Sequence, residues 1–487
     1  MSAERFPRIA SLRGPSALRA RLAELGLALP CDDAVETGPE APLARPLALG
    51  AGPDGPLAAP NRFVVQPMEG WDGTREGLPT ELTERRWRRF GASGAGWVWG
   101  GEAVAVRPDG RANPHQLVLS ARAAPALARL REALLEEARR AGHPAPVVGL
   151  QLTHSGRWSV PEPGLRRPRV AHRHPLLDRR AGVTDCGAVL RDDEVDALVA
   201  DFARAAAWAA EAGFAFVDVK HCHGYLLHEF LAARRRTGRF GGAALEARTR
   251  LARALVAAVR EAAPCLRIGV RLSLFDALPH RTGASGLGEP EPCERPYALG
   301  FGIDPDDPER ADLAEPIAFV RTLRGLGVDW INVTAASPYY APHVQRPALF
   351  PPSDGYPPPE DPLAGVVRLL AAARELKRAV PEAVVVSSGW SYLQEWIPHV
   401  AQACLRAGWF DAVGLGRMAL SYPDLPADVL AGRALARRRV CRTFSDCTSA
   451  PRNGLVSGCY PLDDFYRGRP ERAALEAAKR GAREATG

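Results

Sequence analysis

The chain alternates short apolar runs with longer amphipathic segments, and this alternation restricts its fold more than any other feature. Eight runs have the length and the β-branched or aromatic content of buried strands; they cover residues 63–67, 97–99, 147–152, 216–219, 266–272, 330–333, 384–387 and 412–415. A segment rich in Ala, Leu, Arg and Glu follows each run, near residues 81–91, 121–141, 191–212, 243–262, 311–326, 362–380, 392–407 and 424–436. Successive strand–helix units of this kind predict an α/β fold, the (β/α)8 or TIM barrel.

A barrel of this type gathers its chemistry at the C-terminal ends of the strands. In this chain those ends are polar or glycine: Glu69, Gly100, His154, Lys220 to Tyr225, Arg271, Thr334, Gly389 and Gly416-Arg417. The competing fold is a doubly wound open sheet, which would place a glycine-rich phosphate loop after the first strand. The sequence there is Pro67-Met68-Glu69, so the barrel is the better interpretation.

We predict three parts of the chain: an N-terminal extension over residues 1–56, the barrel over 57–440, and a short cysteine-containing tail over 441–487. Two long loops rich in Pro and Gly, 275–310 and 335–361, have the length of functional loops. The loop 155–190 is strongly basic, and we favour a solvated surface over a site for an anionic substrate tail.

The composition excludes several classes of protein. The net charge of +7 comes from 63 basic and 56 acidic residues that are interspersed, without the basic stripe of a nucleic-acid-binding protein. The nine cysteines are scattered, and we see neither a secretion signal nor an apolar run long enough to span a bilayer. We therefore expect a cytoplasmic protein without membrane or nucleic-acid partners, whose oligomeric state the sequence does not indicate.

Ionisable residues are concentrated where the fourth predicted strand ends. The strand Phe216-Val217-Asp218-Val219 runs directly into Lys220, His221, Cys222 and His223, with Tyr225 two residues further on. Groups of this kind are costly inside a core and useful in a site, because burial shifts their proton affinity. We interpret the stretch as the centre of an active site rather than as a loop of surface histidines.

The same stretch carries a family resemblance. His223-Gly-Tyr-Leu-Leu-His-Glu-Phe-Leu231, followed by Arg236-Thr-Gly-Arg-Phe-Gly-Gly242, resembles the signature of the Old Yellow Enzyme family of FMN-dependent oxidoreductases. Asn61-Arg62 to Pro67-Met68 is similar to that family's opening strand. Gln151-Leu-Thr-His-Ser-Gly-Arg157 is similar to its Q-L-x-H-x-G-R motif. The resemblance covers roughly residues 57–440.

The resemblance implies an FMN site along the rim of the barrel. Its backbone and side chains would come from Pro67, Met68, Glu69, Gly100, Gln151, Arg271, Ser388, Gly389, Gly416 and Arg417. Arg271 lies inside an otherwise apolar strand, where an unpaired guanidinium is very costly. It therefore needs an anionic or strongly accepting partner, which in the family is the flavin; an internal salt bridge is the alternative.

The resemblance also assigns the catalytic residues. Lys220 and His223 would hold the substrate's oxygen and Tyr225 would donate the proton, with Trp71, His221, Tyr339 and Tyr340 around the substrate. Two positions depart from the family pattern. Lys220 stands where the family has His, and Glu69 stands where it has Thr or Cys. Because a carboxylate is disfavoured beside an anionic reduced flavin, we hypothesise that Glu69 is protonated or faces the substrate.

The implied reaction has two halves at one face of the flavin. NADH or NADPH would reduce FMN, and the reduced flavin would pass a hydride to the C=C bond of an α,β-unsaturated carbonyl compound. A flavin-dependent dehydrogenase that oxidises a C–N or C–C bond is the main alternative. An inactive flavin-binding barrel also remains open because of Glu69 and Lys220.

Two metal-based interpretations fit the sequence less well. His221-Cys222-His223 is an H-x-H pattern after a barrel strand, as in metal-dependent amidohydrolases, but those enzymes carry it after the first strand. One branch of the Old Yellow Enzyme family holds a [4Fe–4S] cluster on C-x2-C-x3-C-x11-C. Here Cys441, Cys447 and Cys459 lack the second cysteine and one residue of the spacing. We therefore expect no metal site.

Overall fold

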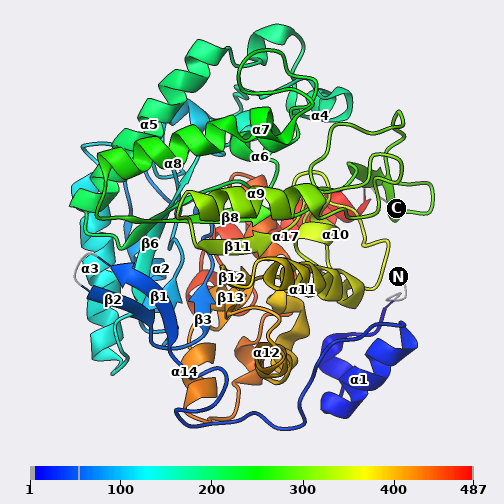
Figure 1. The fold of residues 1–487 in the computed structure, drawn as a ribbon. Helices are drawn as coiled ribbons and strands as arrows, with labels where there is room; N and C mark the ends of the chain where they lie inside the picture. The colour runs from blue at the N-terminus through cyan, green and yellow to red at the C-terminus, as the bar shows by residue number, and fades with distance from the viewer. Residues whose placement is uncertain (1–5, 53–54, 485–487) are drawn as a thin grey trace.

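The computed structural model describes residues 6–52 and 55–484 and forms the predicted barrel (Figure 1). Its strands are β3 Phe63–Val65, β4 Trp97–Val98, β5 Ala103–Ala105, β6 Val147–Thr153, β7 Phe216–Val219, β8 Arg267–Ser273, β11 Trp330–Thr334, β12 Val384–Ser387 and β13 Ala412–Leu415. They pair in parallel in the order β4-β3-β13-β12-β11-β8-β7-β6-β5, and β4 also pairs with β6. That last pairing closes the ring, because β4 and β5 together occupy one position beside β6.

The helices of the barrel follow the predicted amphipathic segments. They are α2 Glu81–Gly91, α3 Ala124–Arg140, α5 Asp192–Glu211, α8 Arg250–Ala262, α9 Ala314–Gly325, α11 Pro362–Ala379, α12 Ile397–Arg406 and α14 Leu425–Leu430. Each turns its apolar face toward the strands; Leu198 and Phe202 of α5 and Leu255 of α8, for example, are buried. The parallel strands therefore have helices on one face and barrel interior on the other, as such sheets require.

Further elements lie in the loops and at the ends of the chain. They are α1 Pro15–Glu24, β1 Leu47–Gly52, β2 Gly55–Ala59, α4 Pro175–Ala181, α6 Leu226–Leu231, α7 Leu245–Arg248, β9 His280–Thr282, β10 Gly288–Pro290, α10 Pro342–Gln345, α13 Arg417–Ser421, α15 Asp446–Arg452, α16 Asp464–Arg467 and α17 Glu471–Glu484, with short 3₁₀ turns between them. Both long loops predicted from the sequence thus contain ordered elements, the β9–β10 ribbon and α10. No helix in the described part of the chain is both long and apolar enough to cross a bilayer.

An antiparallel hairpin of β1 and β2 packs against the N-terminal end of the barrel. Leu47 and Leu49 pack there on an aromatic cluster inside the ring that includes Trp97 and Trp330. The two indoles meet edge to face with centroids 5.0 Å apart, a favourable arrangement for aromatic pairs. The hairpin ends at Ala59 and so crosses the boundary expected between the extension and the barrel at residues 56 and 57.

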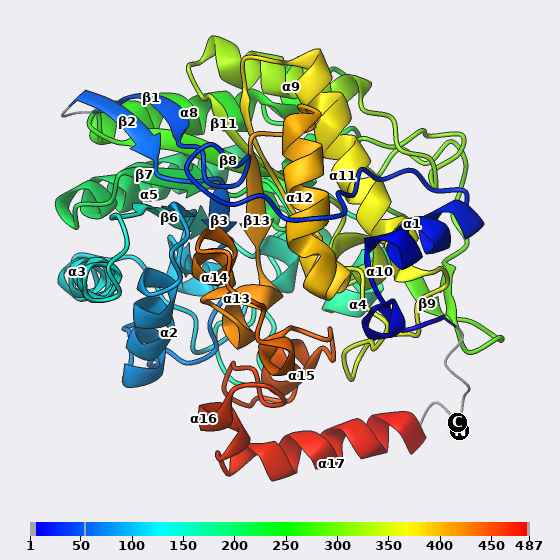
Figure 2. The same cartoon turned by 90° about the horizontal axis from the view of Figure 1, so that it is seen from below.

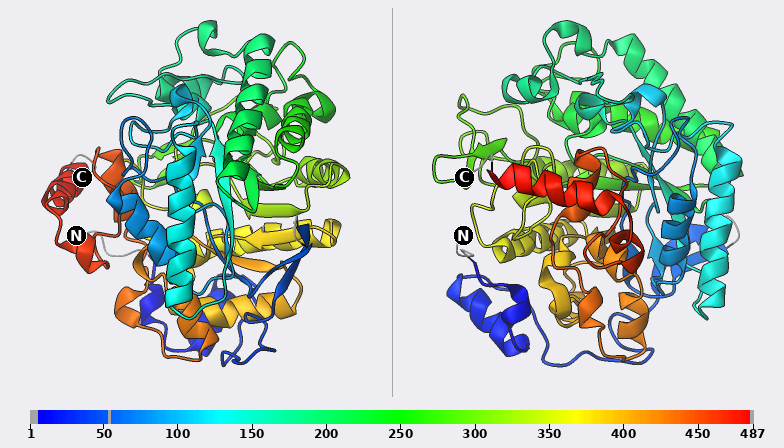
Figure 3. Two further views of the ribbon diagram at one scale, coloured as in Figure 1. Left: turned by 90° about the vertical axis from the view of Figure 1, so that its left-hand side faces the viewer. Right: turned by 180° about the vertical axis from the view of Figure 1, so that it is seen from behind.

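The C-terminal tail folds back over the opposite end of the barrel. Figures 2 and 3 show α17 lying across one face of the molecule next to α15, with which it is in contact. Asp463 of the tail accepts hydrogen bonds from Arg85 at 2.9 and 3.0 Å and from Arg89, both on α2. The backbone N–H of Trp71 donates to Ser457 Oγ at 2.9 Å. The tail is therefore attached to the loops that surround the C-terminal ends of the strands.

Candidate active site

A cavity of about 270 Å³ lies at the C-terminal ends of the barrel strands. Fourteen of the residues predicted from the sequence line it: Pro67, Met68, Glu69, Trp71, Gln151, Lys220, His223, Tyr225, Arg271, Tyr339, Ser388, Gly389, Gly416 and Arg417. They come from strands that are far apart in the sequence and adjacent in the ring. Their convergence is what the barrel topology requires of a site at this end.

Three residues predicted for the site lie outside the cavity lining. Gly100 is packed between the side chains of Pro67 and Gln151, where an added Cβ would come within 2.8 and 3.2 Å of their Cβ atoms. His221 turns toward the helix layer, with Nδ1 2.8 Å from the carbonyl of Val219 and its ring against Phe319. Neighbouring strand residues face opposite sides, so an inward Lys220 sends His221 outward.

Tyr340 is turned away from the cavity as well. Its hydroxyl donates to Asp276 Oδ1 at 2.7 Å, behind the cavity wall. Burial raises the pKa of Asp276 to about 7. Tyr339 takes the cavity-facing position instead, stacked on Trp158 at 4.6 Å between ring centroids and 5° between planes. Of the two tyrosines expected around the substrate, Tyr339 alone lines the cavity.

Asp218 organises the barrel interior below the cavity. It is fully buried and accepts three hydrogen bonds: from Trp99 Nε1 at 2.7 Å, from Gln151 Nε2 at 2.5 Å and from the backbone N–H of Arg271 at 2.7 Å. Burial raises the pKa of Asp218, and these donors oppose the rise. Because Gln151 Nε2 donates to Asp218, the amide oxygen of Gln151 is available to accept a hydrogen bond from a ligand in the cavity.

Arg271 forms no salt bridge with the described residues, so the internal ion pair considered from the sequence is absent there. Its Nη1 donates to the carbonyl of Pro67 at 3.2 Å, and its buried Nε has no partner in the described chain. Burial lowers the pKa of Arg271. A buried guanidinium that donates only to a carbonyl retains unused donors, which suits an electron-rich ligand edge.

Two further arginines, Arg346 and Arg417, line the cavity close to each other. Arg417 follows β13, and Arg346 lies in the loop after β11. Buried nitrogens of both, Nη1 of Arg417 and Nη2 of Arg346, find no acceptor among the described residues. Burial and the neighbouring charge of Arg417 lower the pKa of Arg346 to about 10. Two guanidiniums that repel each other and lack a carboxylate form a site for an anion such as phosphate. The resemblance placed Arg417 at the FMN site and did not include Arg346.

Glu69 and Lys220, the two departures from the family pattern, lie together. Lys220 Nζ is 2.8 Å from Glu69 Oε1. The hydroxyl of Tyr225 donates to Glu69 Oε2 at 2.6 Å, and Lys220 Nζ lies 3.9 Å from the centroid of the Tyr225 ring. The side chains of Lys220 and Glu69 are 4% and 14% exposed. The Glu69 carboxylate therefore faces the Tyr225 hydroxyl and the Lys220 ammonium.

The tyrosines beside this pair are hydrogen-bonded to each other. Tyr225 and Tyr339 have their hydroxyl oxygens 3.0 Å apart. Burial, and after it the negative charge of Glu69, hold the pKa of Tyr225 well above its usual value. Burial and the same carboxylate raise the pKa of Tyr339 to about 12. Both phenols are therefore neutral proton carriers at physiological pH.

His223 completes the group that follows β7. Its backbone is in the left-handed region with φ of 67°, an unusual conformation for a residue with a side chain. Its Nε2 lies 3.1 Å from Gln345 Nε2 and 3.4 Å from Thr334 Oγ1. Burial, then the charges of Arg271 and Lys220, keep the pKa of His223 well below its usual value. A neutral imidazole here can hold a substrate oxygen by donating a hydrogen bond.

The tail supplies part of the cavity wall, a role that was not predicted from the sequence. Cys447, Arg452, Ser457 and Cys459 all line it, and the guanidinium of Arg452 lies 4.6 Å from the ring centroid of Tyr339. The position of the missing second cysteine holds Phe444, whose ring packs on Phe350. Within residues 6–52 and 55–484, no three His, Cys, Asp or Glu side chains are arranged to hold a metal ion.

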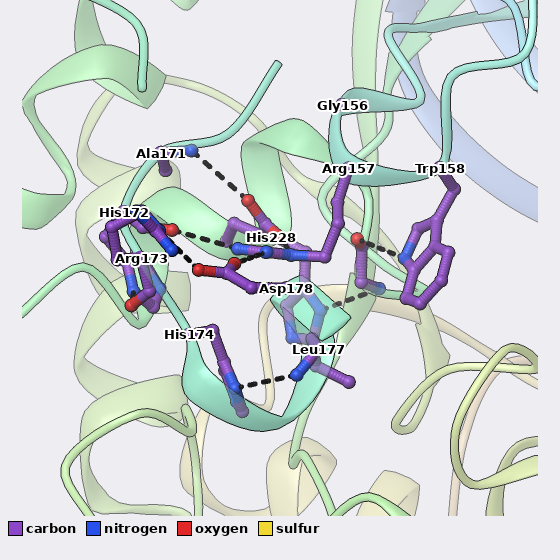
Figure 4. A network of polar contacts seen from close by, with 12 residues as sticks. Gly156, Arg157, Trp158, Ala171, His172, Arg173, His174, Leu177, Asp178 and His228 are labelled. Atoms are coloured by element: carbon purple, nitrogen blue, oxygen red, sulfur yellow. Dashed lines mark hydrogen bonds and ion pairs between the residues drawn. The ribbon is translucent and has the colours of Figure 1, made fainter. Parts of the chain in front are cut away.

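The basic loop 155–190 is not a solvated surface throughout, because several of its arginines form ion pairs. Figure 4 shows Arg157, which is fully buried, beside Asp178 and the carbonyl of His172, to which it donates a 2.9 Å hydrogen bond. Arg157 also forms an ion pair with Glu229. Other arginines of the loop pair with acidic residues, as Arg169 does with Glu194. The positive charge predicted there is largely neutralised by the fold itself.

Comparison with known proteins agrees with this geometry. Residues 55–286 match the NADH:flavin oxidoreductase / NADH oxidase family. An NADPH dehydrogenase of Listeria innocua is 32% identical over 188 residues, which are 38% of this chain and 51% of that protein. The chain thus spans about half the length of the curated relatives it matches. The family match over residues 55–286 includes the strands from β3 to β8.

Solved structures show the same fold. A 2-naphthoyl-CoA reductase complex superposes with a TM-score of 0.65 at 16% identity, over 89% of this chain and 57% of the other. Morphinone reductase, an Old Yellow Enzyme homologue, superposes with a TM-score of 0.55 at 22% identity, over 81% of this chain and 91% of its own. The barrel fold predicted from the sequence is therefore confirmed, and the family match over residues 55–286 supports the predicted resemblance to flavin oxidoreductases of the Old Yellow Enzyme family.

Proposed function

From a barrel whose residues 55–286 match the NADH:flavin oxidoreductase / NADH oxidase family, we propose an FMN-dependent oxidoreductase that uses NADH or NADPH and reduces the activated C=C bond of an α,β-unsaturated carbonyl compound. One observation carries the proposal. Arg271 is buried, Arg346 and Arg417 each have a buried nitrogen without an acceptor, and none of the three has a carboxylate partner in the described chain; all three line the same cavity as Tyr225. Buried unpaired cations are costly, so their presence favours a resident anionic ligand.

The cavity residues fit the chemistry of FMN. Arg346 and Arg417 supply two guanidiniums with free donors for a phosphate group. Arg271 would stabilise negative charge on the flavin ring, and the amide oxygen of Gln151 would accept from the ring's N–H group. Bound FMN supplies a redox centre that accepts hydride from a nicotinamide and delivers hydride to the substrate.

The remaining residues would bind and protonate the substrate. His223 and the unused N–H groups of Lys220 would donate to the carbonyl oxygen, which polarises the C=C bond. Tyr225 would then give its phenolic proton to the α-carbon. A positioned general acid of this kind typically contributes about 10²–10⁴-fold to the rate, and the high pKa of Tyr225 keeps the phenol protonated for this role.

A dehydrogenase that oxidises a C–N or C–C bond is the second candidate, and one contact favours it. Tyr225 directs its proton toward Glu69 at 2.6 Å, so the phenolic oxygen can accept a proton from a ligand on its other side. Such a substrate would reduce the flavin directly, without a nicotinamide.

Substitution of Tyr225 by Phe tests the proposal. Under anaerobic conditions we expect wild-type and Y225F proteins to be reduced by NADPH or NADH at similar rates. Reoxidation by cyclohexenone should be about 10²–10⁴-fold slower in the variant. Y422F is a matched control, since Tyr422 is buried outside the cavity lining and donates to Asp428. Equal slowing of both half-reactions in Y225F would contradict the assignment.

A further inference from the structure

Glu69 and Lys220 lie 151 positions apart in the sequence and form one ion pair in the cavity. Each alone would place an uncompensated charge in a poorly hydrated site, which is strongly unfavourable. Together they are nearly neutral, and both contact Tyr225, one at its hydroxyl and the other at its ring face. Glu69 and Lys220, the two departures from the family pattern, therefore act together on the Tyr225 phenol.

The hydrogen bonds around Tyr225 have a defined direction. A carboxylate has no proton to give, so in the 2.6 Å contact Tyr225 is the donor and Glu69 Oε2 the acceptor. Tyr225 has a single hydroxyl proton, so across the 3.0 Å contact Tyr339 must donate to Tyr225. The proton of Tyr225 thus points to Glu69 and away from a substrate whenever Glu69 is ionised.

Forming a tyrosinate at this position is costly. Burial and the adjacent carboxylate both oppose a negative charge on the phenol. If Tyr225 released its proton alone, the product would be two neighbouring anions, Glu69 and the tyrosinate. This state is avoided if protonated Glu69 transfers its proton to Tyr225 while Tyr225 transfers its hydroxyl proton to the substrate.

We propose that Glu69 is a positioning residue that acts through Tyr225, so that the two form a proton relay whose net acid or base is the Glu69 carboxyl. The inference rests on the proposed function. In substrate reduction, protonated Glu69 breaks its O–H bond and gives the proton to Tyr225 Oη, whose own proton forms the new C–H bond at the carbanionic α-carbon. In substrate oxidation the same protons move in the opposite direction and Glu69 ends protonated.

Lys220 determines whether the Glu69 carboxyl carries a proton before the reaction begins. Its ammonium, 2.8 Å from Glu69 Oε1, stabilises the carboxylate form. The resting relay is then ready to accept a proton, and reduction requires Glu69 to be protonated first. The protonation state of Glu69 therefore favours one direction of the reaction: the carboxylate favours substrate oxidation, and the protonated carboxyl favours substrate reduction.

A double-mutant cycle on the FMN-loaded enzyme tests the relay. The proteins are wild type, E69Q, Y225F and E69Q/Y225F, prereduced with dithionite and mixed with cyclohexenone. We expect E69Q to slow flavin reoxidation by about 10²-fold or more, and the double variant to be no slower than Y225F. Multiplicative losses would show that Glu69 acts independently of Tyr225 and would overturn the relay.

Rates in mixtures of H₂O and D₂O provide a signal that a merely structural role of Glu69 would not produce. Two protons move together in the wild-type relay, so the rate should depend on the deuterium fraction along a curve, and in E69Q along a straight line. A straight line for the wild type would contradict the proposal. The E69Q substitution leaves Lys220 without its counter-ion, so the E69Q/K220M variant serves as a control in which both side chains are neutral. Its rate should also depend linearly on the deuterium fraction.

Infrared difference spectra separate failure of the relay from failure of the proposed reaction, because they need no turnover. The difference between wild type and E69Q isolates the carboxyl bands of Glu69. The Y225F substitution should shift these bands, since it removes the hydrogen bond from Tyr225. Unshifted bands would overturn the relay even if cyclohexenone is a substrate, and shifted bands would support its geometry even if it is not.

Discussion

Replacing Arg417 or Arg346 by Met should have opposite effects on FMN binding and on the stability of the FMN-free protein. Both arginines are half-buried, and each has one buried nitrogen that finds no acceptor in the described chain. Burial, and after it the charge of Arg417, lower the pKa of Arg346 to about 10. Either substitution removes this repulsion and the cost of burying one charge.

The magnitude for binding follows from the lost hydrogen bonds. A hydrogen bond to a charged group contributes about 1.5–3 kcal/mol, and every 1.4 kcal/mol changes an equilibrium constant about tenfold. Each variant should therefore bind FMN about 10- to 100-fold more weakly. The FMN-free variants should unfold at a temperature equal to or above that of the FMN-free wild type.

Quenching of FMN fluorescence on titration with FMN-free protein measures the affinity, and thermal unfolding without FMN measures the stability. R321M is a control, because Arg321 is an exposed arginine of α9 and should change neither quantity. An unchanged FMN affinity in R417M and R346M would refute the assignment of the phosphate site. A large loss of stability in the FMN-free variants would show that the arginines serve the fold instead.

Three further predictions concern the surroundings of the cavity. D463A removes the carboxylate shared by two arginines of α2, so limited trypsin digestion should release the tail faster than in wild type; unchanged digestion would contradict that attachment. Asp276 has a pKa of about 7 because it is buried, against about 3.9 in an unfolded chain. The folded wild type therefore holds an extra proton between these pH values, and its free energy of unfolding falls as pH rises from 5 to 7. In urea unfolding D276N should lack this fall. Parallel pH profiles of the two proteins would show that Asp276 does not cause it. E229Q weakens the partners of buried Arg157 and should cost about 3 kcal/mol in urea unfolding, whereas a change below about 0.5 kcal/mol would show that Asp178 alone suffices.

The sequence predicted the barrel because each strand and helix has its own local period. The family resemblance, together with the convergence of strand ends in that fold, predicted fourteen cavity residues. The position of His221 could also have been predicted. In an extended strand alternate residues face opposite sides, so inward positions Asp218 and Lys220 exclude His221 from the cavity. The resemblance alone, which treats the stretch as a motif, does not contain this constraint.

Other features depend on contacts between distant segments. Nothing near Glu69 in the sequence indicates that Lys220 will neutralise it, because the two meet only when β3 and β7 face each other across the ring. The tail has no periodic pattern that would place Cys447 or Arg452 in the cavity wall. Arg346 lies in a Pro-rich loop, and its role becomes visible only beside Arg417.

An anaerobic absorbance titration tests the central claim most directly. The purified protein, saturated with FMN, is titrated with NADPH and then NADH, and cyclohexenone is added to the reduced sample. We predict a bound-flavin spectrum that bleaches with at least one nicotinamide and returns with cyclohexenone. A protein that binds no FMN, or whose bound flavin neither nicotinamide reduces, would contradict the proposed NAD(P)H-dependent reaction.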